Sequence, residues 1–230
     1  MTNYEDYLKQ VADLGGANTT QNSFLELFIQ TEYGEGYTYE GDLLNNLPNN
    51  YGRVYYPSKE VFEDGQWENG KLNGNGKRYF CWGGPNPEDK YKGRYLRFEG
   101  VFNQGELKKG IIYRPQGDRL FEGEFKDEKL NGLGKVYQLG KILEEGYFIN
   151  GELDGMGQKY FQGKIEKIGS FKTGKLNGKG KIYNPLDGML IAEGYFTDDK
   201  LNGFGTTYHY YSDGSINEHG NFINGIFQGK

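Results

Sequence analysis

The stretch Phe121-Glu122-Gly123-Glu124-Phe125, continued by Leu130-Asn131-Gly132-Leu133-Gly134-Lys135-Val136-Tyr137, decides the fold because copies of it return about every 23 residues. The aromatic residue that ends the first part recurs at intervals of 23, 23, 23, 25 and 26 residues, at Phe102, Phe125, Phe148, Phe171, Phe196 and Phe222. The tyrosine that ends the second part recurs at Tyr137, Tyr160, Tyr183 and Tyr208. Upstream, Trp67 and Tyr79 take these two places. Self-similarity at a fixed period of this length predicts a stacked array of small units.

Each unit is predicted to be a β-hairpin. Apolar residues alternate with glutamates from Phe121 to Phe125, which is the period of a strand. Dipeptides such as Asn150-Gly151 and Thr173-Gly174 are typical of hairpin turns, because both turn positions require a positive φ. A second dipeptide follows four residues later, at Asp154-Gly155 in one copy, and we expect it to be either a bulge or the entry to the second strand. The glycine between the aromatics predicts a close approach, with a ring of a neighbouring repeat against the backbone.

Glu-Gly-x-Phe followed by Leu-Asn-Gly-x-Gly-x-x-Tyr at this period resembles the MORN (membrane occupation and recognition nexus) repeat family. The resemblance covers residues 60–225 well and residues 33–56 less well, and it predicts seven to eight repeats. It implies an all-β fold, an elongated single-layer antiparallel sheet of consecutive hairpins with aromatics on one side. It also implies a non-catalytic role in scaffolding or in attachment to membranes and the cytoskeleton. Related repeats occur in radial-spoke heads, in junctional membrane proteins and beside enzyme domains.

The N-terminal part of the chain lacks the repeat. Residues 1–32 are predicted to be a short helical extension, and residues 33–230 the array, with a long loop near residues 81–94. Apolar residues recur at helical spacing from Tyr4 to Leu14, and Ser23-Phe24-Leu25-Glu26 resembles a capping box that opens a second helix. Three alternatives are open for this extension: a cap on the open edge of the first hairpin, an amphipathic helix that docks into a partner, or disorder.

Composition narrows the classes of function. The net charge is −5 and the sequence pI about 5.3, which argues against a general nucleic-acid binder. Cys81 is the single cysteine, so no disulfide framework exists, in keeping with a cytoplasmic location. The acidic start of the chain resembles neither a signal nor a transit peptide, and no segment approaches the length of a transmembrane helix. With His209 and His219 as the two histidines, we expect no catalytic, cofactor, metal or small-molecule site.

The leading functional hypothesis is a scaffold that joins a larger cytoskeletal or ciliary (axonemal, radial-spoke-like) complex through protein–protein contacts. A helix or an extended peptide of a neighbouring protein would lie in a groove of the array. The candidates to line it are Tyr79, Tyr137, Tyr160, Tyr183 and Tyr208. The alternation of strand residues does not decide which face of the second strand is inside, so these tyrosines are either groove residues or core residues.

The sequence is also compatible with two other functions. A peripheral membrane tether would bind anionic phospholipids through a central group of lysines, Lys164, Lys167, Lys172, Lys175 and Lys179. The alternative role for these lysines is a solvated surface that keeps the sheet soluble. A regulatory subunit would instead position a separate enzyme. The insertion around Trp82 is a candidate for a specific contact with a partner, or a loop without a role.

Overall fold

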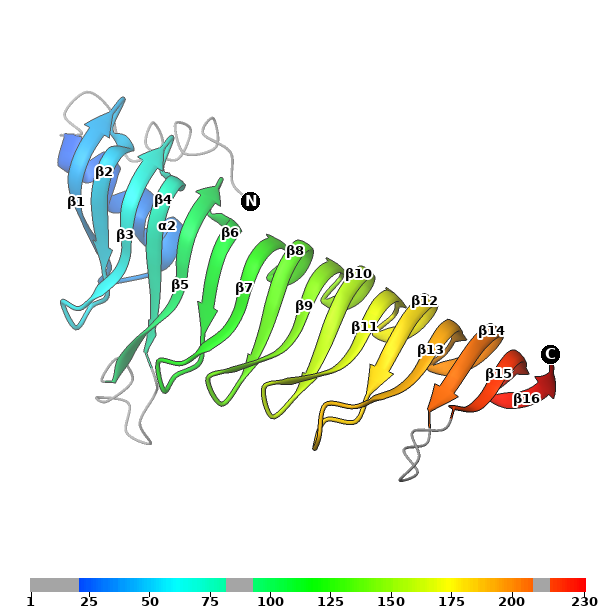
Figure 1. Ribbon diagram of the computed structural model, residues 1–230. Helices are drawn as coiled ribbons and strands as arrows, with labels where there is room; N and C mark the ends of the chain where they lie inside the picture. The colour runs from blue at the N-terminus through cyan, green and yellow to red at the C-terminus, as the bar shows by residue number, and fades with distance from the viewer. Residues whose placement is uncertain (1–20, 82–92, 209–215) are drawn as a thin grey trace. The chain divides into compact units, whose positions relative to one another are not determined.

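The computed structural model describes residues 21–81, 93–208 and 216–230 (Figure 1). These residues form one helix and sixteen strands: α2 (Gln21–Tyr33), β1 (Thr38–Leu44), β2 (Leu47–Tyr55), β3 (Val61–Glu68), β4 (Lys71–Cys81), β5 (Arg94–Asn103), β6 (Glu106–Tyr113), β7 (Arg119–Lys126), β8 (Lys129–Gln138), β9 (Lys141–Ile149), β10 (Glu152–Phe161), β11 (Lys164–Lys172), β12 (Lys175–Tyr183), β13 (Leu190–Thr197), β14 (Lys200–Tyr208), β15 (Ile216–Ile223) and β16 (Ile226–Gly229). The prediction of an all-β fold with a short N-terminal helix is confirmed.

The strands form a single antiparallel sheet in which the strand order follows the chain order from β1 to β16. The chain divides into two compact units, residues 1–108 with 115–117, and residues 109–114 with 118–230. Eight hairpins are present among the described residues, which agrees with the upper count from the sequence. The expected insertion falls between the end of β4 and the start of β5, and residues 82–92 lie outside the described residues.

The hairpin turns are the dipeptides that the sequence marks. Asn150 and Gly151 have φ angles of 52° and 87°, and Thr173 and Gly174 have 46° and 74°. Two successive positive φ values match the right-handed twist of the flanking strands. The second dipeptide is a bulge, because the register between β9 and β10 shifts between Leu153 and Gly157. Both predictions for the two dipeptides are therefore confirmed.

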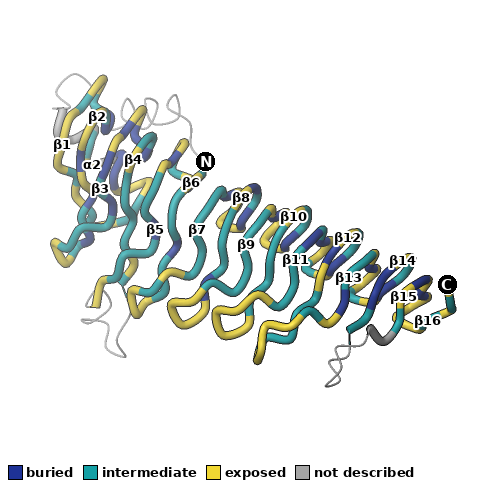
Figure 2. Tube along the Cα trace, viewed as in Figure 1, coloured by how far each residue is buried: buried dark blue, intermediate teal, exposed yellow. Residues whose placement is uncertain are grey.

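The core is a row of aromatic and leucine side chains on one face, which we call the aromatic face. Phe148 on β9 pairs with Leu153 on β10, and both side chains are fully buried. The same position of every other first strand from β3 onward is also buried: Trp67, Phe102, Phe125, Phe171, Phe196 and Phe222. Figure 2 shows these buried stretches returning from one hairpin to the next. The recurring aromatic of the sequence is therefore the core residue of each repeat.

Six of the hairpin turns are also tied to the hairpin before them. The amide of Gly151 donates a hydrogen bond of 2.8 Å to the carbonyl of Leu130, and the amide of Gly174 one of 2.9 Å to that of Leu153. Equivalent bonds run from Gly70 to Pro48, Gly105 to Leu72, Asp199 to Leu176, and Gly225 to Leu201. These bonds hold the turn end of a hairpin against its predecessor, on the side where the leucines are buried. A sheet can bury one face in this way without a second layer.

The glycine of each first strand does lie in close contact, but with different atoms from those expected. A Cβ on Gly123 would lie 2.5 Å from Cα of Gly134 on the next strand and 3.1 Å from the side chain of Leu130. The expectation of a ring from a neighbouring repeat at this point is wrong. Paired strands approach here backbone to backbone, and the leucine below fills the space that a side chain would take.

Helix α2 packs on the aromatic face of the first unit. Phe28 and Ile29 are buried, and the Phe28 ring occupies the position where a side chain on Gly70 would stand. The Tyr33 hydroxyl donates a 2.9 Å hydrogen bond to the buried carboxylate of Glu63 on β3, which also accepts a bond of 2.5 Å from Arg78. The helix begins two residues before the predicted capping box and ends at Tyr33. The other predicted helix, from Tyr4 to Leu14, lies outside the described residues.

Candidate functional site: a groove with a glycine floor

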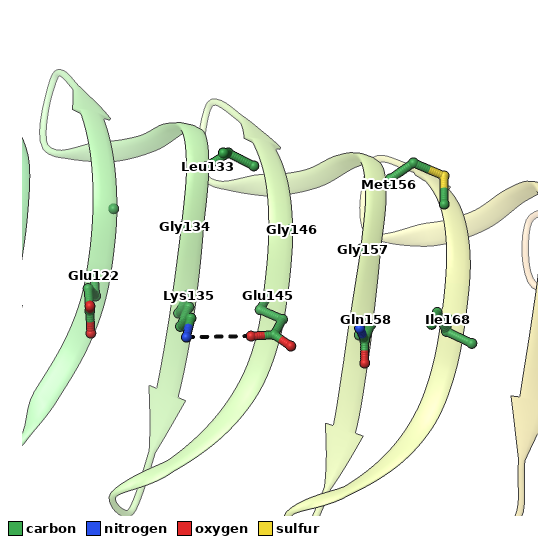
Figure 3. A pocket seen from close by; sticks show the side chains of 11 residues that line it. Glu122, Leu133, Gly134, Lys135, Glu145, Gly146, Met156, Gly157, Gln158 and Ile168 are labelled. Carbon is green, nitrogen blue, oxygen red and sulfur yellow. Dashed lines mark ion pairs between the residues drawn. The ribbon is translucent and has the colours of Figure 1, made fainter.

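The second unit carries an open groove on the face opposite the aromatic core. Two adjoining hollows of about 470 and 760 Å³ make up this groove, and Met156 and Ile168 line both. Its floor is the backbone of one glycine from each of eight strands: Gly123, Gly134, Gly146, Gly157, Gly169, Gly180, Gly194 and Gly205. Figure 3 shows two rows of side chains flanking this floor in the first hollow. Because the floor has no side chains, a ligand can approach the backbone there.

The first row lies toward the hairpin turns, and we call it the turn-side row. It contains large apolar side chains that are exposed, among them Met156 at 65% and Phe204 at 52%. The groove members of this row are Leu133, Met156, Ser170, Lys179, Tyr195 and Phe204. Tyr147 lies directly opposite Leu133 and is also exposed. Exposed apolar side chains that gather along one side of a groove are typical of a binding surface.

The second row lies toward the connections between hairpins, and we call it the connection-side row. Its members face one another across the strands: Glu122, Lys135, Glu145, Gln158, Ile168, Lys181, Glu193, Thr206 and His219. Lys135 pairs with Glu145 at 3.7 Å and Lys181 with Glu193 at 2.8 Å. The hydrogen bond from Lys181 lowers the pKa of Glu193, and the same bond raises the pKa of Lys181. This row therefore presents mostly polar and paired groups to a ligand.

The predicted groove tyrosines lie just beyond the connection-side row. Tyr137 is buried and donates a 2.8 Å hydrogen bond to Glu122, and Tyr208 donates one of 2.7 Å to Glu193. Tyr160 bonds Glu145 and Gln158, and burial, followed by the bond to Glu145, raises its pKa to about 12. Tyr183 lines the second hollow of the groove. In the first unit, the guanidinium carbon of Arg94 lies over the ring of Tyr79, 4.4 Å from the centre of that ring.

The predicted lysine group divides between different places. Lys167 pairs with Asp199 at 3.1 Å, and Lys164 donates to the carbonyl of Leu186 at 2.6 Å. Lys172 lies directly opposite Lys175, next to the hairpin turn, and Lys179 lines the groove. By strand alternation, these three lysines share the groove face. The last candidate, Trp82, lies outside the described residues.

The exposed apolar residues of the turn-side row are the groove residues that the sequence reading did not single out. The variable position of the Gly-x-Gly motif is held by Leu133, Met156 and Phe204 in three copies of the repeat. The variable position of the Gly-x-Phe motif is held by Tyr147 and Tyr195 in two copies. A large apolar residue repeatedly placed between two strand glycines is a usable signal. It points away from the aromatic face, since its neighbours on either side point toward the core.

Two other kinds of site have no support in the described part of the chain. Residues 21–81, 93–208 and 216–230 hold no cluster of three or more His, Cys, Asp or Glu side chains that could bind a metal ion. No helix within the same ranges has the length and apolar character needed to cross a membrane.

Comparison with known proteins agrees with the repeat geometry. The MORN repeat pattern matches six segments, residues 39–61, 64–84, 121–137, 145–163, 168–185 and 193–215. A search of curated proteins finds no match. The hairpin of β5 and β6 is not matched. Its second strand has one residue fewer between Leu107 and Gly110 than β8 has between the equivalent residues Leu130 and Gly134. The matched segments cover more than half of the sequence, and the MORN repeat is a non-catalytic repeat, so this chain belongs to the MORN repeat family.

Proposed function

We propose that this protein is a non-catalytic scaffold that binds a segment of a partner protein along the groove of its second unit. The observation that carries the proposal is the turn-side row, where large apolar side chains remain exposed beside a floor of bare backbone. A helix or an extended segment could cover these side chains. Their burial would supply about 25 cal/mol for each Å² of apolar surface removed from water.

The partners in this proposal are subunits of a larger cytoskeletal or ciliary assembly in the cytoplasm. The occurrence of related repeats in radial-spoke heads supports that setting. A chain made almost wholly of hairpins is suited to such a role, because neighbouring repeats offer a continuous surface along which contacts can be spread. Contacts spread in this way predict that single substitutions in the groove weaken binding by modest amounts, whereas paired substitutions weaken it strongly.

The test is to isolate tagged protein gently from its native cells and to quantify stoichiometric companions by mass spectrometry. The groove variant combines Met156→Glu with Phe204→Glu, and the control combines Leu139→Glu with Leu186→Glu. All four side chains are large and exposed, but Leu139 and Leu186 lie outside the groove. We expect companions to be lost from the groove variant alone. Equal recovery with both variants would contradict the proposal. A single catalytic companion would instead indicate a regulatory subunit.

A second candidate function is a tether to an anionic membrane surface. It is favoured by Lys172, Lys175 and Lys179, which share the groove face and form no ion pair with any described residue. Charge reversal of all three should abolish binding to anionic vesicles, and binding by the unaltered protein should fall as salt rises. If anionic and neutral vesicles bind equally weakly, this second function is wrong.

A further inference from the structure

Among the four hairpins from β7 to β14, the tyrosine near the end of the second strand makes the same hydrogen bond in three hairpins and lacks it in one. Tyr137, Tyr160 and Tyr208 each donate a hydrogen bond to a glutamate fifteen residues earlier, on the first strand of the same hairpin. Tyr55 in the first unit makes the same bond to Glu40. Each repeat of this kind therefore supplies its own carboxylate to its own tyrosine.

The exception is the hairpin of β11 and β12. The residue fifteen positions before Tyr183 is Ile168, and no described residue forms a hydrogen bond with the Tyr183 hydroxyl. Both Ile168 and Tyr183 line the second hollow of the groove. The acidic residue of this strand is instead Glu166, at the place held by Leu120, Leu143 and Ile191 in the neighbouring hairpins. That carboxylate is about 7 Å farther along the strand.

The presence of Ile168 in place of a glutamate also unbalances the charges of the connection-side row. Lys135 lies between Glu122 and Glu145, with a carboxylate on the strand at either side. In the first unit, Arg53 lies between Glu40 and Asp64, and Lys77 between Asp64 and Glu99. Lys181 has Glu193 on one side and Ile168 on the other. Lys181 therefore has one flanking carboxylate, whereas Lys135 in the same row and Arg53 and Lys77 in the first unit each have two.

A positive surplus surrounds this position. Lys179 lies two residues from Lys181 on the same face and lines the same hollow. It has no ion pair within the described ranges, although it contributes to the lowered pKa of Glu193, after the larger effects of Lys181 and Tyr208. Lys172 and Lys175 add two more positive charges on this face near the turn. An acidic group would be favoured here, since a carboxylate that accepts from charged donors makes stronger hydrogen bonds than a neutral acceptor.

We propose that the partner segment supplies the missing carboxylate. An aspartate or glutamate of the partner would lie beside Ile168 and take the role that Glu122, Glu145 and Glu193 have in the other hairpins. It would accept from the Tyr183 hydroxyl and pair with Lys181 or Lys179. A large apolar residue beside that acidic residue would lie against Met156 and Ile168, at the junction of the two hollows. This inference rests on the proposed function and fixes the chemistry of the segment that the groove binds: an acidic residue next to an apolar one.

The test fills the site from within the chain. Ile168→Glu places a carboxylate where the other hairpins have one, so the Tyr183 hydroxyl and Lys181 gain an internal partner. The full chain and this variant are each used to select from a displayed library of random twelve-residue peptides. We expect the unaltered protein to enrich peptides with Asp or Glu beside a large apolar residue. The peptide most enriched should then bind Ile168→Glu at least about tenfold more weakly by fluorescence anisotropy.

The matched control is Ile165→Glu, which makes the same change of residue and charge on the same strand. Ile165 is 37% exposed and lies outside the groove lining, so this variant should bind the peptide within about twofold of the unaltered protein. Tyr183→Phe should weaken binding without changing the fold, since it removes one hydroxyl that has no internal partner. Circular dichroism melting of all variants verifies that each is folded.

The possible outcomes separate the two proposals. If acidic–apolar peptides bind the unaltered protein and Ile168→Glu equally well, the missing-carboxylate inference is wrong while binding in the groove stands. If the selected peptides carry no acidic preference, the inference is also wrong. If no peptide is enriched and the Met156 and Phe204 variants keep every companion, the proposed function itself fails.

Discussion

At the scale of single residues, the central division is between side chains that face the core and side chains that face the groove. Adjacent residues of one strand take opposite roles: Phe148 is fully buried, whereas Tyr147 is 45% exposed. The strand period produces this division, because successive side chains point to opposite faces of a sheet. Substitutions at neighbouring positions should therefore affect different properties.

Phe148→Ala is expected to destabilise the protein by about 3–5 kcal/mol, and Phe171→Ala by a similar amount. Each change removes a buried ring and leaves a cavity beneath the sheet. Tyr147→Ala, at the exposed neighbour, should cost less than about 1 kcal/mol. Urea unfolding followed by circular dichroism gives the three values. Similar losses at Phe148 and Tyr147 would contradict the assignment of the two faces.

Tyr160 should titrate with a pKa of about 12, because it is partly buried and bonded to Glu145. Its pKa is raised on folding, so its contribution to stability is present below the ordinary tyrosine value of about 10. That contribution is lost as the pH rises from about 10 to about 12. The absorbance difference at 295 nm between the unaltered protein and Tyr160→Phe isolates this transition. Glu145→Gln should move it toward lower pH, and an unshifted transition would remove Glu145 as a cause.

At the scale of elements, each hairpin depends on a tight turn, a bulge and a close contact between paired glycines. The turn and the bulge were predictable, since Asn-Gly and Asp-Gly dipeptides have strong backbone preferences. The atoms that meet at Gly146 were not, because the sequence does not say whether a ring or a strand backbone lies opposite. Nor could the sequence show which face of the second strand carries Tyr160. The face on which Tyr160 lies depends on the register shift between Lys159 and Tyr160, and no local sequence motif predicts this shift.

Gly146→Ala should cost about 1–3 kcal/mol more than Gly140→Ala. Both glycines have a positive φ, 146° and 73°, so both substitutions strain the backbone. A Cβ on Gly146 would also lie 2.5 Å from Cα of Gly157, whereas a Cβ on Gly140 meets nothing within 4 Å. The difference in unfolding free energy between the two variants isolates the contact between strands. Equal costs would show that the strands can separate without penalty.

Helix α2 should be held to the first unit by Tyr33 as well as by apolar packing. Tyr33→Phe removes the donor to Glu63 and leaves a buried carboxylate with one partner fewer, which should cost about 1–3 kcal/mol. Amide hydrogen exchange in residues 21–33 should become faster in this variant. Unchanged exchange would mean that Phe28 and Ile29 are sufficient to hold the helix.

At the scale of the whole molecule, the repeat makes the core uniform and leaves the groove face free to vary. The period, the fold and the family could be read from the sequence, because the glycines and aromatics that carry the core recur at fixed intervals. The groove was only partly predictable. Tyr183 was among the predicted residues and does line it, whereas Met156 and Phe204 were found from the structure. The predicted lysine group is also divided between the two faces of the sheet, because Lys167 pairs with Asp199 on the aromatic face.

The most direct test of the central claim is site-specific photo-crosslinking in the native cells. A photoreactive phenylalanine analogue is placed at Tyr195 in the groove, or at Leu186, an exposed residue outside it. Binding in the groove predicts that the Tyr195 probe forms covalent adducts with a stoichiometric companion and that the Leu186 probe does not. Adducts from Leu186 alone, or from neither position while the companions still co-purify, would contradict the claim that partners bind in the groove.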